Sequence, residues 1–224
     1  AKPYRFKARP WDLEQVESTC TSCSVGCRIS VHSSRDRILR FQGVDDEAVN
    51  WGWLCDRGRF NFESVHSDRR LGEPLIRTTD GLAPTDWSSA LSLTAGLVRS
   101  AIDAGGAESI AILGGARGTN EDALAWSALA DALGIERRDA RLGDGISLDL
   151  LDLPRATIAE AATASTIVLI APDLKEELPV LHLRLRDAAL RSGAKIIEFT
   201  QTGSGLTRHA WRSIRHLPGA GAQT

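Results

Sequence analysis

The four cysteines of this 224-residue chain lie at positions 20, 23, 27 and 55. Three of them form the pattern C-x2-C-x3-C, and the fourth follows after a long gap. Four thiolates can hold a [4Fe–4S] cubane, one on each iron. We therefore expect Cys20, Cys23, Cys27 and Cys55 to bind one closed cluster. Because no iron is left open for substrate, such a cluster stores or transfers electrons, or supports the fold.

Two other uses of these cysteines fit the pattern less well. A bond between Cys20 and Cys23 would need a redox-active or strained geometry, and no secretion signal opens the chain. Four thiolates also suit tetrahedral zinc, but zinc modules usually bring two short cysteine pairs from separate loops. Here three ligands come from one loop, which favours the cubane. The C-x4-C-x2-C spacing of plant-type [2Fe–2S] sites is absent.

Residues around the cysteines fit such a site. Gly26 can provide a tight turn just before Cys27. Trp51 and Trp53 precede Cys55, so their rings could keep water from the cluster, or they could simply pack in a core. Positive charge near an anionic cluster would raise its reduction potential, and the sequence offers it at Arg28, Arg57 and Arg59.

The first 72 residues are expected to form a small β-rich domain around the metal. Apolar bursts at 28–33 and 37–42 flank a polar turn and predict a β-hairpin, and 13–18 is a further candidate strand. A module of this size has a marginal hydrophobic core, so a metal cluster would stabilise it. Pro74 marks a change of pattern, and we place the domain boundary between residues 72 and 73.

Residues 73–224 alternate between helical and strand patterns. Asp86 and Thr119 are candidate N-caps of helices that end at Gly105–Gly106 and Gly134. A third helix is expected over 177–192, and strands over 109–113, 166–170 and 195–199. This order predicts an incomplete α/β domain with a mainly parallel, doubly wound sheet. The glycine-rich turn 114–118 could cradle a phosphate, but glycines there are also ordinary turn residues.

Composition excludes several classes of function. The net charge of −2 gives no basic stripe for nucleic acid, and apolar runs stay far below the roughly 20 residues of a membrane span. We expect no nucleic-acid partner and no direct membrane insertion. The sequence contains no methionine, so we expect it to be an internal piece of a longer polypeptide.

The chain resembles the molybdopterin oxidoreductase superfamily. The cysteine module followed by a doubly wound α/β domain carries that likeness. Within the superfamily, three segments are most similar to the family of the large peripheral-arm (G) subunit of NADH-quinone oxidoreductase, respiratory complex I: RPW at 9–11, GWLCDRGRF at 52–60 and EPLIR at 73–77. The resemblance covers essentially the whole chain and is strongest over residues 9–77.

Two positions distinguish this chain from the molybdenum and tungsten enzymes of that superfamily. Those enzymes generally carry Lys two residues after the fourth cysteine, where this chain has Arg57. Many bind the metal through Cys, selenocysteine or Ser a few residues after an Ala-Arg-aliphatic run. In the matching stretch 140–145 (ARLGDG), Gly143 stands at that place and has no side chain to coordinate. The resemblance therefore implies that molybdopterin is absent.

The resemblance implies an iron–sulfur subunit of an oxidoreductase and translocase complex of the respiratory chain, with the other peripheral-arm subunits as partners. It implies a cytoplasmic location on the inner face of the cell membrane, reached through the complex. The fragment alone would have no catalytic residues. The alternatives are a fragment of a catalytic molybdopterin oxidoreductase, such as a formate dehydrogenase, and a zinc-stapled interaction module.

The remaining polar residues suggest no catalytic group. The five histidines show no catalytic spacing, and we expect surface or capping roles for them: His32, His66, His182, His209 and His216. The arginine pairs at 137–138 and 184–186 are expected to be solvated charges on helix faces or ends.

Overall fold

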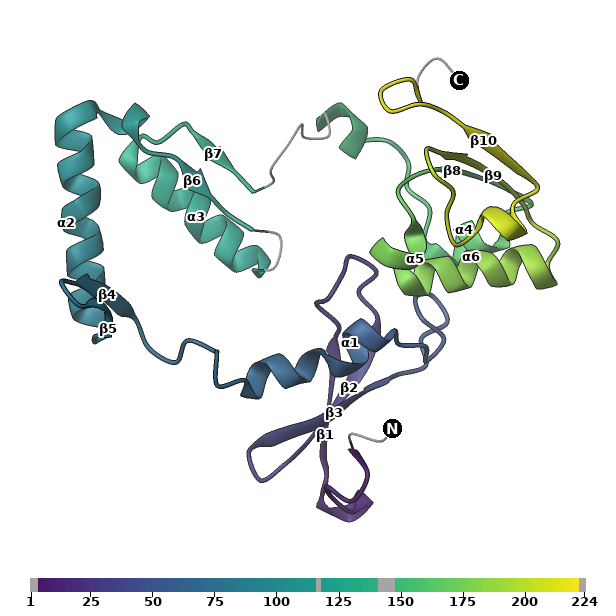
Figure 1. The fold of residues 1–224 in the computed structure, drawn as a ribbon, viewed down its shortest axis with the longest axis horizontal. Coiled ribbons are helices and arrows are strands. Elements are labelled where there is room, and N and C mark those ends of the chain that lie inside the picture. The colour runs from purple at the N-terminus through teal and green to yellow at the C-terminus, as the bar shows by residue number, and fades with distance from the viewer. Residues whose placement is uncertain (1–3, 116–117, 141–147, 222–224) are drawn as a thin grey trace. The chain divides into compact units, whose positions relative to one another are not determined.

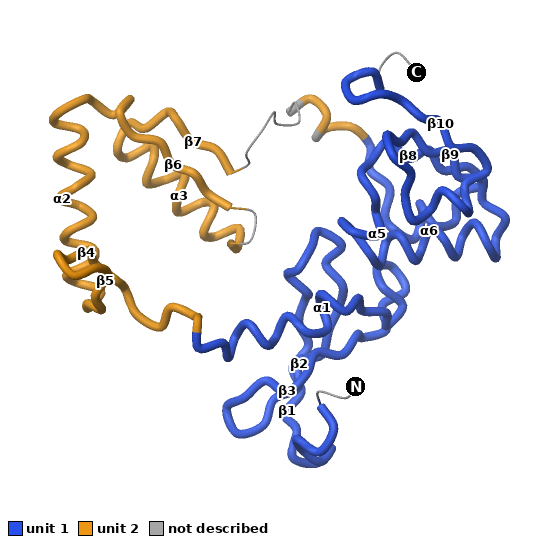
Figure 2. The backbone as a smooth tube through the Cα atoms, in the orientation of Figure 1, with its two compact units in different colours: residues 1–68, 154–224 blue, residues 69–153 orange. Residues whose placement is uncertain are grey.

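The computed structural model describes residues 4–115, 118–140 and 148–221. They form two compact units: unit 1 joins residues 1–68 to 154–224, and unit 2 spans 69–153 (Figure 2). No helix among the described residues is both long and apolar enough to cross a membrane. The predicted domain boundary between residues 72 and 73 stays a prediction.

The N-terminal part of unit 1 is a three-stranded antiparallel sheet in the order β1-β2-β3 (Figure 1). Its strands are β1 (Glu14–Thr19), β2 (Arg28–Ser34) and β3 (Arg37–Gly43). Arg35 and Asp36 both have positive φ, of 51° and 59°, as a tight hairpin turn requires. The predicted hairpin is confirmed. Helix α1 (Asp56–Phe60) and a 3-10 helix (Asn61–His66) follow.

The C-terminal part of unit 1 is a parallel three-stranded sheet with helices packed against it (Figure 1). Its strands, in the order β10-β9-β8, are β8 (Thr166–Ile170), β9 (Lys195–Thr200) and β10 (Arg212–Arg215). Its helices are α4 (Ile158–Thr163), α5 (Leu174–Glu177) and α6 (Pro179–Arg191). Leu185 and Ala188 of α6 share a buried core with Ile196 of β9, which fixes the helix on the sheet.

Unit 2 contains the two long predicted helices. Helix α2 (Trp87–Gly105) is capped by the Asp86 side chain, and α3 (Asn120–Leu133) begins with a capping box made by Thr119 and Asp122. Both predicted N-caps are confirmed. The remaining strands are the antiparallel pair β4 (Leu75–Thr78) and β5 (Gly81–Pro84), and the parallel pair β6 (Ile112–Leu113) and β7 (Arg138–Asp139).

Two element predictions were wrong in extent. The helix expected over 177–192 is found as α6, but it starts two residues later, because Leu178 leaves helical geometry (φ −133°, ψ 67°) and Pro179 is its first residue. The strand expected over 109–113 is reduced to β6, since residues 107–109 form a 3-10 turn instead. The sheets of the described residues are small parallel and antiparallel ones; a doubly wound sheet stays a prediction.

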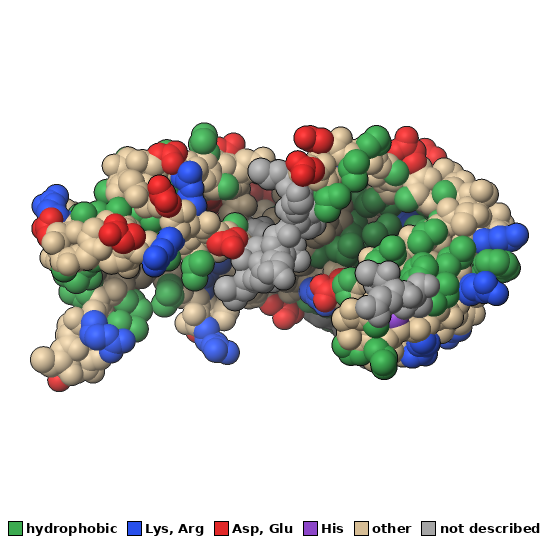
Figure 3. Space-filling view, turned by 90° about the horizontal axis from the view of Figure 1, so that it is seen from above, with side chains coloured by type: hydrophobic (Ala, Val, Ile, Leu, Met, Phe, Trp, Pro, Cys, Tyr) green, Lys and Arg blue, Asp and Glu red, His purple; other side chains and the backbone are tan. Residues whose placement is uncertain are grey.

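Apolar side chains remain on the surface of both units, as the green atoms of Figure 3 show. In unit 2 no residue of α2 is buried. The largest exposed apolar residues of its two long helices are Trp87, Leu91, Leu97, Leu124 and Trp126.

Candidate iron–sulfur site

The four cysteines lie at the ends of regular elements in unit 1. Cys20 directly follows β1, Cys27 directly precedes β2, and Cys55 is the N-cap of α1. The backbone N–H of Cys20 donates to the carbonyl of Cys27 at 2.8 Å, which closes the loop that carries Cys23. Gly26 makes the tight turn expected of it, with φ of 65°. Strand pairing of β1 with β2 thus brings three thiols together.

All four cysteines share one packed apolar cluster of side chains, which we call the cysteine pocket. Cys20 and Cys27 are buried in it, and Cys23 and Cys55 pack against it from the sides. Each of the four carries a free thiol. The buried apolar members of this pocket are Val25, Ile29, Leu54 and Val180. Val180 belongs to α6, so the pocket also joins the N-terminal sheet to the C-terminal part of unit 1.

Gly58 marks where Cys20 and Cys55 converge. A Cβ added to this glycine of α1 would lie 2.9 Å from the Cys20 sulfur and 3.7 Å from the Cys55 sulfur. Its backbone N–H donates to Cys55 Sγ at 3.4 Å. The short first turn of α1 therefore lies directly against two of the four thiols, which are far apart in sequence.

Electrostatics show that the thiols influence one another. The pKa of Cys27 is raised to about 12, first by burial and then by the neighbouring Cys20, Cys23 and Cys55. Without bound cations this thiol stays protonated at neutral pH. Several thiolates in one apolar pocket require positive charge among them, which the irons of a cluster would supply.

The donor set has the number of thiols that a cubane takes as ligands. Zinc needs its thiolates to converge on one point, at about 2.3 Å from each sulfur. A cubane takes one thiolate per iron and so spreads its ligands around a larger core. Four thiols around a shared pocket fit that requirement.

The tryptophans form an apolar wall on one side of the pocket. Trp53 packs against the cysteine pocket, and Trp51 meets Trp53 edge to face, with ring centroids 5.2 Å apart. Trp53 therefore lies where its ring could keep water from a cluster. It is at the same time part of a packed core. Trp51 lies one layer further out, beneath the guanidinium of Arg184 at 3.6 Å.

The three arginines named for positive charge make different contacts. Arg28 pairs with Glu17 at 3.4 Å and binds Thr19 on exposed β1. Arg59 donates to the carbonyl of Leu54 at 3.2 Å, within the ligand segment itself. Arg57 donates to the carbonyl of Glu176 at 2.8 Å, which ties the turn after Cys55 to α5. Arg57 and Arg59 are thus held close to a ligand, whereas Arg28 is neutralised by an acid.

Three expectations of surface exposure were wrong. Arg184 is only 2% exposed, and His32 and His182 are 4% and 6% exposed. His32 accepts a hydrogen bond from Arg40 at 3.0 Å, so burial of a neutral imidazole is compensated, and burial lowers its pKa. Arg184 lies four residues after buried Val180 on α6, the spacing of one helix face. That spacing was the available sequence signal for its burial.

A basic cavity opens beside Cys55. It measures about 310 Å³ and is lined by Cys55, Asp56 and Arg57 together with Lys175, His182 and Arg186 of the C-terminal part, so its cations outnumber its one acid. A second cavity of about 410 Å³ shares its last three residues and adds Arg208 and Gly205. These cations suit an anionic ligand.

The structure says less about the glycine-rich turn 114–118 and about Gly143, the position that matches a metal ligand in related enzymes. Gly114 and Gly115 end β6 and line a cavity of about 400 Å³ with Trp126 and Arg138 in unit 2. Residues 116–117 and the position of Gly143 lie outside the described residues. The phosphate role of the turn and the missing ligand both stay predictions.

Comparison with known proteins gives the family. Residues 13–67 match the molybdopterin oxidoreductase Fe4S4 domain, and residues 70–219 match the molybdopterin oxidoreductase domain. The chain belongs to the molybdopterin oxidoreductase family. The four cysteines lie within the part that matches the Fe4S4 domain of this family, which supports an iron–sulfur cluster as the cofactor.

Relatives of this chain include subunits of NADH-quinone oxidoreductase. The chain is 32% identical over 96% of its length to the NADH-quinone oxidoreductase G subunit of Streptomyces coelicolor, and 33% identical over the same share to that of Mycobacterium tuberculosis. It is 30% identical over 98% of its length to NADPH-Fe(3+) oxidoreductase subunit alpha of Geobacter sulfurreducens. It spans about a quarter of the length of these relatives. The resemblance to the respiratory G subunit is confirmed.

Proposed function

We propose that this chain is the part of an NADH-quinone oxidoreductase subunit that holds one closed [4Fe–4S] cluster through Cys20, Cys23, Cys27 and Cys55. The observation that carries this is the meeting of all four thiols in one apolar pocket, with Gly58 against two of the sulfurs. When bound, the cluster accepts and returns single electrons. The protein supplies thiolates, an apolar wall at Trp53 and a backbone N–H to Cys55 Sγ.

The wider assignment rests on the similarity to the G subunit of NADH-quinone oxidoreductase. We propose that the cluster domain covers residues 1–72 and that residues 73–224 begin a doubly wound α/β domain. The other peripheral-arm subunits would be its partners, on the cytoplasmic face of the membrane. Molybdopterin would be absent, and the described fragment would have no catalytic residue of its own.

One observation favours a second candidate, a catalytic molybdopterin oxidoreductase. The cavity beside Cys55 keeps the cations Arg57, Lys175 and Arg186, which an anionic cofactor would need. Such a protein would pass electrons between that cofactor and the cluster. A scaffold that has lost the cofactor could keep the same cations for contacts such as the one from Arg57 to Glu176.

Metal analysis of the anaerobically purified full-length protein decides between these candidates. We expect no molybdenum or tungsten in the protein. Reduction should give a cubane EPR signal, and Cys55→Ala should lose this signal together with about four irons and four sulfides. Molybdenum or tungsten with a pterin would support the catalytic candidate instead. Stoichiometric zinc at these cysteines without acid-labile sulfide, from an iron-replete culture, would contradict both.

A further inference from the structure

Ser22 lies in the ligand loop, between Cys20 and Cys23. Its hydroxyl oxygen is buried, and no group in the described residues forms a hydrogen bond with it. Ser24, two residues later in the same loop, is exposed to solvent. A buried hydroxyl without a partner costs free energy, so native structures rarely keep one. Because Ser22 stands between the expected ligands Cys20 and Cys23, a cluster bound there would bring sulfur acceptors to this loop.

The contents of the pocket limit what that partner can be. Its buried members other than cysteine are Val25, Ile29, Leu54 and Val180, which carry no polar side-chain atom. Its side-chain acceptors are the sulfurs of the cysteines, to which a bound cluster would add inorganic sulfides. The pocket already directs one donor to a ligand sulfur, since the Gly58 N–H reaches Cys55 Sγ at 3.4 Å.

We infer that the Ser22 hydroxyl donates a hydrogen bond to a sulfur of the bound cluster or of its ligands, and that Ser22 thereby sets the reduction potential. This inference rests on the proposed cluster. Reduction adds one electron, and a hydrogen bond to sulfur stabilises the more negative state more strongly. Ser22 is a positioning and tuning residue, while the cysteines bind the iron.

The test is a redox titration of the full-length protein with its clusters, followed by EPR. The relevant signal is the one that disappears in Cys55→Ala. We expect Ser22→Ala to lower the midpoint potential of this cluster. The equilibrium constant for its one-electron reduction should fall roughly threefold to tenfold, where tenfold corresponds to about 59 mV. Ser22→Thr keeps the hydroxyl and should restore the midpoint. Ser24→Ala is the matched control and should leave it unchanged.

A second measurement reports the hydrogen bond directly. Proton ENDOR of the reduced cluster in H2O and D2O should show an exchangeable coupled proton that Ser22→Ala removes and Ser24→Ala keeps. If Ser22→Ala does not retain its cluster, Ser22→Gly also removes the hydroxyl without adding a thiol and should likewise remove that coupling.

The outcomes separate the two proposals. An unchanged midpoint and an unchanged proton coupling in Ser22→Ala would overturn the role of Ser22 while leaving the cluster assignment intact. A parent protein whose iron and sulfide content equals that of Cys55→Ala would overturn both.

Discussion

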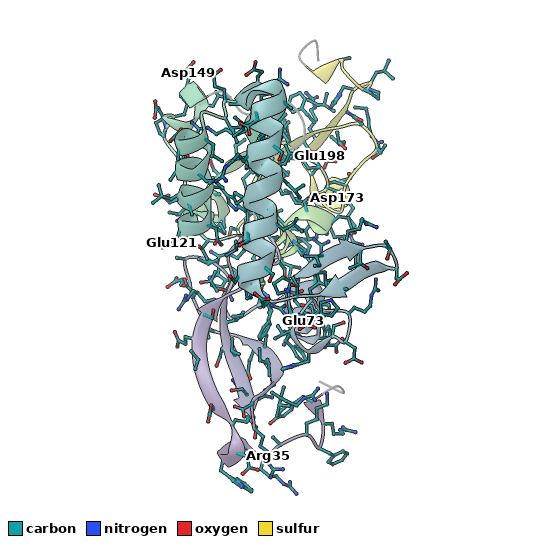
Figure 4. The ribbon with its side chains drawn as sticks, turned by 90° about the vertical axis from the view of Figure 1, so that its left-hand side faces the viewer. Arg35, Glu73, Glu121, Asp149, Asp173 and Glu198 are labelled. Atoms are coloured by element: carbon teal, nitrogen blue, oxygen red, sulfur yellow. The ribbon has the colours of Figure 1, made fainter. Side chains whose placement is uncertain are left out.

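Glu198 is a buried carboxylate on β9 whose charge is held by hydroxyl groups. Its two oxygens accept hydrogen bonds from Ser204 and Ser213, each at 2.7 Å. Figure 4 labels it, and it is only 2% exposed. Burial alone would raise its pKa, but these hydrogen bonds, one from Thr207 and the charge of Arg215 lower the pKa below its ordinary value.

The lowered pKa of Glu198 predicts a pH dependence of stability. The contribution is present above pH 4.5, the ordinary value, and is lost as pH falls from there through the lower pKa of the folded state. Glu198→Gln should therefore reduce the free energy of unfolding near pH 7 by about 1–3 kcal/mol, with a smaller difference in acid. Urea unfolding at several pH values measures this. Exposed Glu63→Gln is the control, and a difference independent of pH would contradict the prediction.

Arg184 connects two elements of unit 1 that are distant in sequence. From α6 its Nη1 donates to the carbonyls of Glu47 at 2.8 Å and Val49 at 3.3 Å, and its guanidinium lies over Trp51. The loop it holds leads from β3 to Cys55. The buried guanidinium is thus stabilised by two carbonyls, by an aromatic face and by the charges of Asp187, Glu47 and Asp46.

Replacing Arg184 should loosen this connection. We expect Arg184→Met to lower the free energy of unfolding by roughly 1–3 kcal/mol, because the carbonyls of Glu47 and Val49 lose their charged donor. Arg191→Met on the same helix is the matched control, since the Arg191 side chain is 80% exposed. Hydrogen exchange should show faster opening of residues 44–53 only in the first variant. Equal stabilities of the two variants would rule out this role.

Local sequence signals predicted most elements, because caps and turns act over a few residues. Asp86 and Thr119 began their helices as expected, and Gly106 and Gly134 ended them with positive φ. The start of α6 was placed two residues early, because Glu177 ends the separate short helix α5. The site could be predicted only as far as its four ligands. Contacts such as Arg57 with Glu176, 119 residues apart, depend on tertiary packing that no short pattern encodes.

At the scale of the whole molecule, the cysteine pocket connects the two parts of unit 1. Val180 of α6 packs in the same pocket as Ile29 of β2, so a cluster bound by the cysteines would stabilise both parts of unit 1. We expect Cys55→Ala to lose the cluster and to lower the midpoint temperature of unit 1. Circular dichroism with parallel iron analysis measures both. The cluster-free parent should melt like the variant, and a variant that melts like the cluster-loaded parent would refute the stabilising role.

The closeness of Gly58 to the Cys20 sulfur has a consequence for variation at this position. Even a methyl group there would lie 2.9 Å from that sulfur, closer than real contacts allow, and only 3.0 Å from Leu54 Cδ1. A sulfur fixed on iron cannot move aside. A library with every amino acid at position 58, screened for the brown colour of colonies or lysates, should therefore return glycine alone.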